Sequence, residues 1–154
     1  MRYRIFLDTN ILISGIFFEG NESKILDMPE IELITCEDVV YELKSVTKKK
    51  LKYLDQRNLE IALLEVDRAL SDIEVLPREK YLDKSLEVEG LIAHEKDISI
   101  LAAALYANVD YLLTGDSHFF TDKVKSELKV RKASSVRLGF CMHQKNGEKS
   151  EFFT

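Results

Sequence analysis

Two short apolar segments of the chain each end in an aspartate, and this pattern constrains the fold more than any other feature. Residues 5–7 read Ile-Phe-Leu and are followed by Asp8, and residues 111–115 read Tyr-Leu-Leu-Thr-Gly and are followed by Asp116. Such runs are typical of strands buried inside a sheet, and open α/β sheets bind ligands just beyond the carboxyl ends of their strands. Carboxylates gathered there would repel one another unless cations neutralised them, so the pattern indicates a divalent metal site.

Strand-like and helix-like segments alternate along most of the chain. Apolar or alternating patterns predict strands at residues 3–7, 31–35, 73–76 and 110–114. Helical periodicity predicts helices at residues 8–18, 22–27, 36–46, 59–70, 85–93 and 97–107. Thr35-x-x-Asp38 resembles a capping box that would start the third of these helices. The β-α-β-α order predicts one domain over residues 1–154, a three-layer α/β/α fold with a mainly parallel central sheet.

The carboxyl-terminal tail has a different pattern. Four apolar residues alternate with other residues, as in a half-buried strand: Val136, Leu138, Phe140 and Met142. Asn146-Gly147 then favours a tight turn, and residues 151–153 could form the returning strand. The tail therefore predicts a C-terminal β-hairpin.

Composition limits the classes of protein to which the chain can belong. Its 154 residues suit one domain, and 45% apolar with 32% charged residues indicates a globular, soluble chain. A net charge of -5 argues against bulk electrostatic coating of nucleic acid, although local basic patches remain compatible with it. Cys36 and Cys141 show neither metal spacing nor a disulfide framework, so a cytoplasmic location is expected. We expect no signal peptide and no membrane span.

Three acids have simple structural alternatives. Asp8 and Asp97 could cap the helices that follow them, and Asp116 could be an ordinary turn residue. Taken together with Glu42 they are more persuasive than any one alone, because independent caps need not converge on one place.

Glu42 cannot be explained as a helix cap or as a turn residue. On the predicted helix, Val39, Leu43 and Val46 form an apolar stripe, and Glu42 projects from the same stripe. A carboxylate on a core-facing stripe is costly unless it is paired or bound to metal. The alternatives are a basic partner or an edge position near water.

Four segments of the chain resemble the PIN-domain family of metal-dependent ribonucleases. The matching segments occur in the family's order: residues 6–12, residues 40–43, Asp97 with the alanines at 102–104, and residues 113–119. The resemblance runs from residue 3 to about residue 120. It implies a five-stranded sheet of order 3-2-1-4-5, which would bring Asp8 and Asp116 together where the winding reverses.

The resemblance also implies the site residues. It assigns one or two Mg²⁺ or Mn²⁺ ions to Asp8, Glu42, Asp97 and Asp116. Asn10 and Thr114 match supporting positions, and Ser117 could orient Asp116 or only shape the turn. Oxygen-only ligands suit these hard ions, and no His/Cys set in the sequence favours zinc. The resemblance implies an endoribonuclease, and the expected chemistry is in-line hydrolysis of RNA phosphodiester bonds.

The sequence predicts no direct metal role for the histidines. His118 follows Asp116 and could be a general base, but a turn histidine packed by Phe119 and Phe120 is favoured. His94 and His143 belong to no predicted constellation.

Basic residues form two regions that could contact RNA. The first contains Lys48, Lys49, Lys50 and Lys52, with Tyr53 as a stacking candidate. The second runs from Lys123 to Arg137. Both could equally be solvated faces.

Three classes of function are considered for this sequence: a nuclease of the toxin type, a non-catalytic binding module and a phosphatase. The family includes the toxins of toxin-antitoxin pairs, so the resemblance implies a protein antitoxin and a homodimer as expected partners. A non-catalytic RNA- or protein-binding module is the main alternative, and the complete acid set argues against it. A haloacid-dehalogenase type of phosphatase would need an aspartate where Asn10 stands, so this class is disfavoured.

Overall fold

Five parallel strands form one central sheet, in a computed structural model that describes residues 2–51 and 56–136. The strands are β1 (Tyr3–Leu7), β2 (Ile31–Cys36), β3 (Glu74–Leu76), β4 (Tyr111–Leu113) and β5 (Val130–Arg131). Their order across the sheet is β3-β2-β1-β4-β5, and every neighbouring pair is parallel. The predicted strand order and fold class are therefore confirmed.

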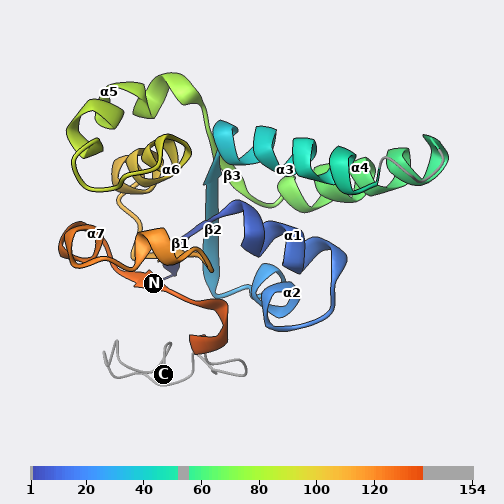
Figure 1. Cartoon of the computed structure of the whole chain (residues 1–154). Helices are drawn as coiled ribbons and strands as arrows, with labels where there is room; N and C mark the ends of the chain where they lie inside the picture. The colour runs from blue at the N-terminus through green and yellow to red at the C-terminus, as the bar shows by residue number, and fades with distance from the viewer. Residues whose placement is uncertain (1, 52–55, 137–154) are drawn as a thin grey trace.

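Helices cover both faces of this sheet. Figure 1 shows the first four helices on one side of the sheet and α5 and α6 on the other. The α-helices are α1 (Thr9–Phe17), α2 (Asn21–Leu26), α3 (Glu37–Lys50), α4 (Gln56–Leu70), α5 (Arg78–Val88), α6 (Glu95–Tyr106) and α7 (Asp122–Glu127). Two short 3₁₀ helices are η1 (Ser117–Phe119) and η2 (Ala133–Ser135). The predicted three-layer architecture is confirmed.

The chain reverses its direction of winding between β1 and β4. β1 pairs with β2 on one side, where Phe6 lies opposite Ile34, and with β4 on the other, where Leu7 lies opposite Leu113. The pairing continues one step past the strands, because the Asp8 amide donates to the Leu113 carbonyl at 3.2 Å. The carboxyl ends of β1 and β4 therefore lie side by side at the switch point, where such sheets bind ligands.

Burial on both faces of the sheet explains why its central strands are continuously apolar. Ile5, Phe6 and Leu7 are fully buried, because helices cover both faces of the sheet. In α6 the three alanines at 102–104 are also fully buried. Their small side chains let the α6 backbone approach its neighbours closely.

Helix α5 differs from the prediction. The structure places it at Arg78–Val88, whereas the sequence pattern favoured residues 85–93. Pro77 ends β3 and, with φ of -68°, is the N-cap of α5. Its fixed φ suits the start of a helix. Tyr81 and Val88 are the buried residues of α5. The predicted helix therefore lies too far toward the carboxyl end of the chain.

The predicted capping box at Thr35-x-x-Asp38 is wrong. Thr35 belongs to β2, and α3 begins two residues later with Cys36 as its N-cap and no capping side chain. The Thr35 hydroxyl donates to the Leu7 carbonyl at 2.9 Å instead. Because Thr35 is fully buried, its hydroxyl must find a partner inside the sheet.

Several predictions concern residues outside the described part of the chain. The C-terminal hairpin beyond Val136, and the candidate RNA contacts Lys52 and Tyr53, lie there. Among residues 2–51 and 56–136, no helix is both long and apolar enough to cross a membrane.

Candidate active site

Asp8 lies at the centre of the strand ends and is held by two hydrogen bonds. It is the N-cap of α1, and its Oδ1 accepts from the Thr9 amide at 2.7 Å. Its Oδ2 accepts from the Thr114 hydroxyl at 2.6 Å. Only 4% of Asp8 is exposed, so these bonds fix a buried carboxylate. Asp8 therefore caps α1, and it also lies at the strand end where the metal site is predicted.

Thr114 connects Asp8 to Asp116. Besides donating to Asp8, the Thr114 Oγ1 accepts from the Asp116 amide at 3.1 Å. Thr114 is fully buried and follows β4 directly. Its hydroxyl therefore connects the end of β4 to the Asp8 carboxylate at the end of β1. This is the placement expected of a residue that positions both aspartates.

Glu42 is held by Thr9, a residue that the sequence analysis did not single out. The Thr9 Oγ1 donates to Glu42 Oε2 at 2.8 Å, which joins the start of α1 to α3. Glu42 is half-buried beside the fully buried Val39 and Leu43. A threonine after a strand-end acid resembles an ordinary helix-start residue. Only the need of Glu42 for a partner could have pointed to it.

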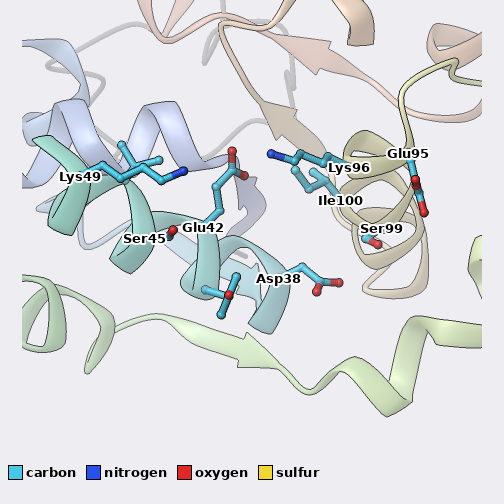
Figure 2. A pocket seen from close by; sticks show the side chains of 10 residues that line it. Asp38, Glu42, Ser45, Lys49, Glu95, Lys96, Ser99 and Ile100 are labelled. Carbon is cyan, nitrogen blue, oxygen red and sulfur yellow. The ribbon is translucent and has the colours of Figure 1, made fainter.

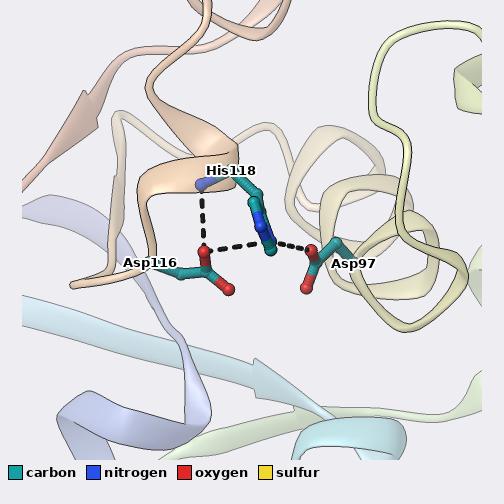
Figure 3. A group of neighbouring side chains, drawn as sticks. All are labelled: Asp97, Asp116 and His118. Carbon is teal, nitrogen blue, oxygen red and sulfur yellow. Dashed lines mark hydrogen bonds and ion pairs between the residues drawn. The ribbon is translucent and has the colours of Figure 1, made fainter.

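Asp97, Asp116 and His118 form a second cluster (Figure 3). The His118 Nδ1 lies 3.1 Å from Asp97 Oδ2 and 3.2 Å from Asp116 Oδ1. Asp116 Oδ1 also accepts from the His118 amide at 2.9 Å. One oxygen or nitrogen from each of the three residues lies within 4.8 Å of the others.

Both nearby histidines correct the sequence analysis. His118 is in a turn, as expected, but its ring faces the two acids. His94, which was assigned to no constellation, stacks on it with ring centroids 3.9 Å apart. The expected oxygen-only set of ligands therefore has an imidazole inside it. The signal was the spacing of His118 two residues after Asp116, which alone could not show where the ring points.

All four predicted acids line one cavity of about 410 Å³. Its lining comes from the β1–α1 junction, α1, α3, the start of α6 with its N-cap, and the segment from the β4–η1 loop into η1: Asp8, Thr9, Asn10, Glu42, His94, Glu95, Lys96, Asp97, Ile100, Asp116 and His118. The supporting residues differ in placement. Asn10 lines the cavity but is exposed, and the hydrogen bonds to Asp8 and Glu42 come from threonines. Ser117 is exposed on η1, where its carbonyl accepts from the Phe120 amide.

The electrostatics of the cavity favour a cation. Burial raises the pKa of Asp8, and the charges of Glu42 and Asp116 raise it further, against the hydrogen bonds from Thr114 and Thr9. Burial and the charge of Asp116 likewise raise the pKa of Asp97, against the His118 contact. The ionised carboxylates thus destabilise one another. A divalent cation would remove this penalty, so the donor set fits Mg²⁺ or Mn²⁺.

A second cavity of about 310 Å³ adjoins the acidic one between α3 and α6 (Figure 2). The two cavities share Glu42, Glu95, Lys96 and Ile100 in their linings. Figure 2 shows Lys49 of α3 and Lys96 of α6 extending toward the Glu42 carboxylate. Of the predicted basic contacts that the structure describes, Lys49 lines this groove, whereas Lys48 and Lys50 are exposed elsewhere on α3.

Fold and site together define an open α/β domain with a metal-type acidic pocket at its switch point. The family model described as PIN domain matches residues 6–138 of this chain. The chain therefore belongs to the PIN-domain family.

Solved structures share the fold at low sequence identity. FitAcB from Neisseria gonorrhoeae aligns with a TM-score of 0.66 and 17% identity, covering 86% of this chain and 99% of that one. VapBC2 from Rickettsia felis, bound to a promoter DNA fragment, gives 0.61 and 20%, with coverage of 84% and 98%. PAE2754 from Pyrobaculum aerophilum gives 0.63 and 18%, with coverage of 87% and 93%. The comparison with curated proteins gives no match.

Proposed function

We propose that this protein is a metal-dependent endoribonuclease that hydrolyses RNA phosphodiester bonds. The observation that carries the proposal is the convergence of Asp8, Glu42, Asp97 and Asp116 on one cavity at the switch point of the sheet. Membership of the PIN-domain family supports a nuclease over an unrelated use of the same acids.

Each acid has a role that its surroundings favour. We assign Asp8, Asp97 and Asp116 to the binding of Mg²⁺ or Mn²⁺, directly or through water. When bound, one or two such ions would supply an activated water and neutralise charge on the scissile phosphate. Glu42 binds a second ion or orients the attacking water. Thr114 fixes Asp8, and Thr9 fixes Glu42, so both carboxylates keep one orientation before substrate arrives.

Lysines beside the acids provide the contact to the RNA backbone. Lys49 and Lys96 line the groove that adjoins the acidic cavity. We propose that they contact phosphates next to the scissile one, and that Lys48 and Lys50 contribute through the wider field of α3. This arrangement explains how a chain of net charge -5 could bind RNA at one place.

We further propose that the protein is the toxin of a toxin-antitoxin pair in the cytoplasm, with a protein antitoxin as inhibitor and a homodimer as its assembly. The solved structures of similar fold include a toxin-antitoxin complex from Klebsiella pneumoniae and DNA-bound VapBC from Salmonella typhimurium. The main alternative remains a non-catalytic module that binds RNA or protein.

The decisive experiment compares Asp8→Asn with the wild type on RNA in Mg²⁺ and in Mn²⁺. We expect Asp8→Asn to lose at least about 100-fold in rate, as when a group that stabilises developing charge is removed. Asp83→Asn, at an exposed position on α5, is the matched control and should retain full activity. Circular dichroism checks the fold. Equal rates for Asp8→Asn and wild type would contradict the site, and RNA binding without any cleavage would favour the non-catalytic module.

A further inference from the structure

The ring of His118 occupies the place where two proposed metal ligands face each other. Its Nδ1 lies 3.1 Å from Asp97 Oδ2 and 3.2 Å from Asp116 Oδ1 (Figure 3). The acids come from different elements, the first turn of α6 and the loop after β4, and the imidazole lies between them. A cavity of four acids would need no histidine for an oxygen-only site.

We propose that His118 is itself a metal ligand through Nδ1, and that it shifts the selectivity of the site from Mg²⁺ toward Co²⁺ and Zn²⁺. This inference rests on the proposed function, since it concerns the same cavity. An imidazole that binds an ion through Nδ1 uses the lone pair of that nitrogen and carries its proton on Nε2.

The spacing of the ligand atoms supports a shared ion. Neighbouring ligands of an octahedral ion at about 2.0–2.1 Å are separated by about 3 Å. His118 Nδ1 lies at hydrogen-bond distance from Asp97 Oδ2, 3.1 Å, and 3.2 Å from Asp116 Oδ1, and both separations are also of this size. All three ligand atoms lie within 4.8 Å of one another, so a small side-chain adjustment could bring them around one ion.

The ring is held in this orientation by contacts on two sides. The His118 amide donates to Asp116 Oδ1 at 2.9 Å, which fixes the backbone of η1 relative to that carboxylate. On its face, the ring stacks on His94 with an interplanar angle of 17°. A ligand that is oriented before the ion arrives loses less conformational entropy on binding.

The chemistry of imidazole gives the inference a consequence. Mg²⁺ prefers carboxylate and water oxygens, whereas imidazole suits later transition ions. A site of two carboxylates and one imidazole should therefore bind Co²⁺ and Zn²⁺ better than a site of carboxylates alone. The carboxylates would then provide the affinity for a divalent cation, and His118 would determine which cation is preferred.

The test uses the full chain loaded with Mn²⁺ and measured by pulsed electron paramagnetic resonance. A directly bound imidazole gives a nitrogen coupling, which we expect in the wild type and in His94→Gln but not in His118→Gln. Calorimetry should show that His118→Gln lowers Co²⁺ affinity by at least about 10-fold while Mg²⁺ affinity changes little. His118 is exposed on a short turn, so the variant should fold, and circular dichroism verifies this.

The outcomes separate this inference from the proposed function. Mn²⁺ binding without nitrogen coupling, or coupling that survives His118→Gln, would overturn the role of His118 and leave the acidic site intact. It would mean that the imidazole only bridges the acids when no ion is bound. If Mn²⁺ does not bind, or binds Asp97→Asn as tightly as the wild type, the proposed metal site itself fails.

Discussion

The two halves of the acidic cavity are built differently. In the half formed by Asp8 and Glu42, each carboxylate accepts a hydrogen bond from a threonine hydroxyl, at 2.6 Å from Thr114 and 2.8 Å from Thr9. In the half formed by Asp97 and Asp116, both carboxylates contact the imidazole of His118. The first half is fixed by neutral hydroxyl donors next to the strand ends, and the second by a side chain that can bind a metal or carry a charge.

This difference assigns different tasks to the two halves. A carboxylate held by a hydroxyl keeps its orientation whichever ion is bound. The partly exposed half can adapt, because His118 lies on a short 3₁₀ turn and 45% of its side chain is exposed. We infer that the threonine half positions the reacting groups, and that the histidine half tunes the ion.

The largest expected effect is the stabilisation that the ion itself provides. At an ion concentration about 100 times the Kd, binding stabilises the folded state by about 2.7 kcal/mol. For a chain of this size we expect Mn²⁺ to raise Tm by about 5–10 °C, and a chelator to reverse the shift. Differential scanning calorimetry measures both. Asp97→Asn should lose most of the shift, and a shift that is unchanged in this variant would place the ion elsewhere.

Removal of the hydroxyl that joins the strand ends should have the next largest effect. Thr114→Val keeps the shape of a fully buried residue but leaves the Asp8 Oδ2 and the Asp116 amide without their partner. We expect a loss of about 1–3 kcal/mol in stability and about 10–100-fold in activity. Ser117→Ala is the control, since Ser117 is exposed, and it should be nearly neutral. If Thr114→Val and Ser117→Ala lost the same stability and activity, Thr114 would support the site no more than Ser117 does.

Asp8→Asn should stabilise the metal-free protein at neutral pH. Burial raises the pKa of Asp8, so the folded state binds this proton more tightly than the unfolded chain. The resulting stability is fully present below the ordinary carboxyl pKa of 3.8 and is lost as pH rises through the raised pKa. Asparagine resembles the protonated acid at every pH. We expect a gain of about 1 kcal/mol at pH 7, or about 2–4 °C in Tm.

The control for this prediction is the same comparison at lower pH. As pH falls through the raised pKa of Asp8 toward 3.8, the wild type recovers the lost stability, so its Tm should approach that of Asp8→Asn. A gap that widens over this range would mean that the carboxylate is stabilised in its ionised form, against the repulsion described above.

The sequence was sufficient for four of the five strands and for the acids because both depend on local pattern, whereas the strand order came from the family resemblance. Asp8 and Asp116 follow buried apolar runs, and Glu42 interrupts an apolar stripe, so each was visible within a few residues. β5 is only Val130–Arg131, two residues, and no periodicity can be read from a segment that short.

Thr114 is implied as a partner of the acids by the family resemblance, but the partners Thr9 and His118 could not be predicted, because their contacts come from packing between distant elements. Thr9 reaches Glu42 across 33 residues, and His118 reaches Asp97 across 21. The composition around Thr9 and His118 fits ordinary turn and helix-start residues equally well. Only the approach of α1 to α3, and of η1 to α6, decides which atoms meet.

The smallest effect is expected in the groove that leads away from the threonine half. Lys49 lines this groove and Lys48, the next residue along α3, does not. On an Asp8→Asn background that leaves RNA uncut, Lys49→Gln should weaken binding of single-stranded RNA and reduce its salt slope by about 0.7–1, the share of one phosphate contact. Lys48→Gln should change the slope less, because its charge acts only through the screened field of the surface. Filter binding between low and moderate salt measures both slopes. Identical slopes for the two variants would mean that α3 attracts RNA as a whole and that the groove holds no particular phosphate.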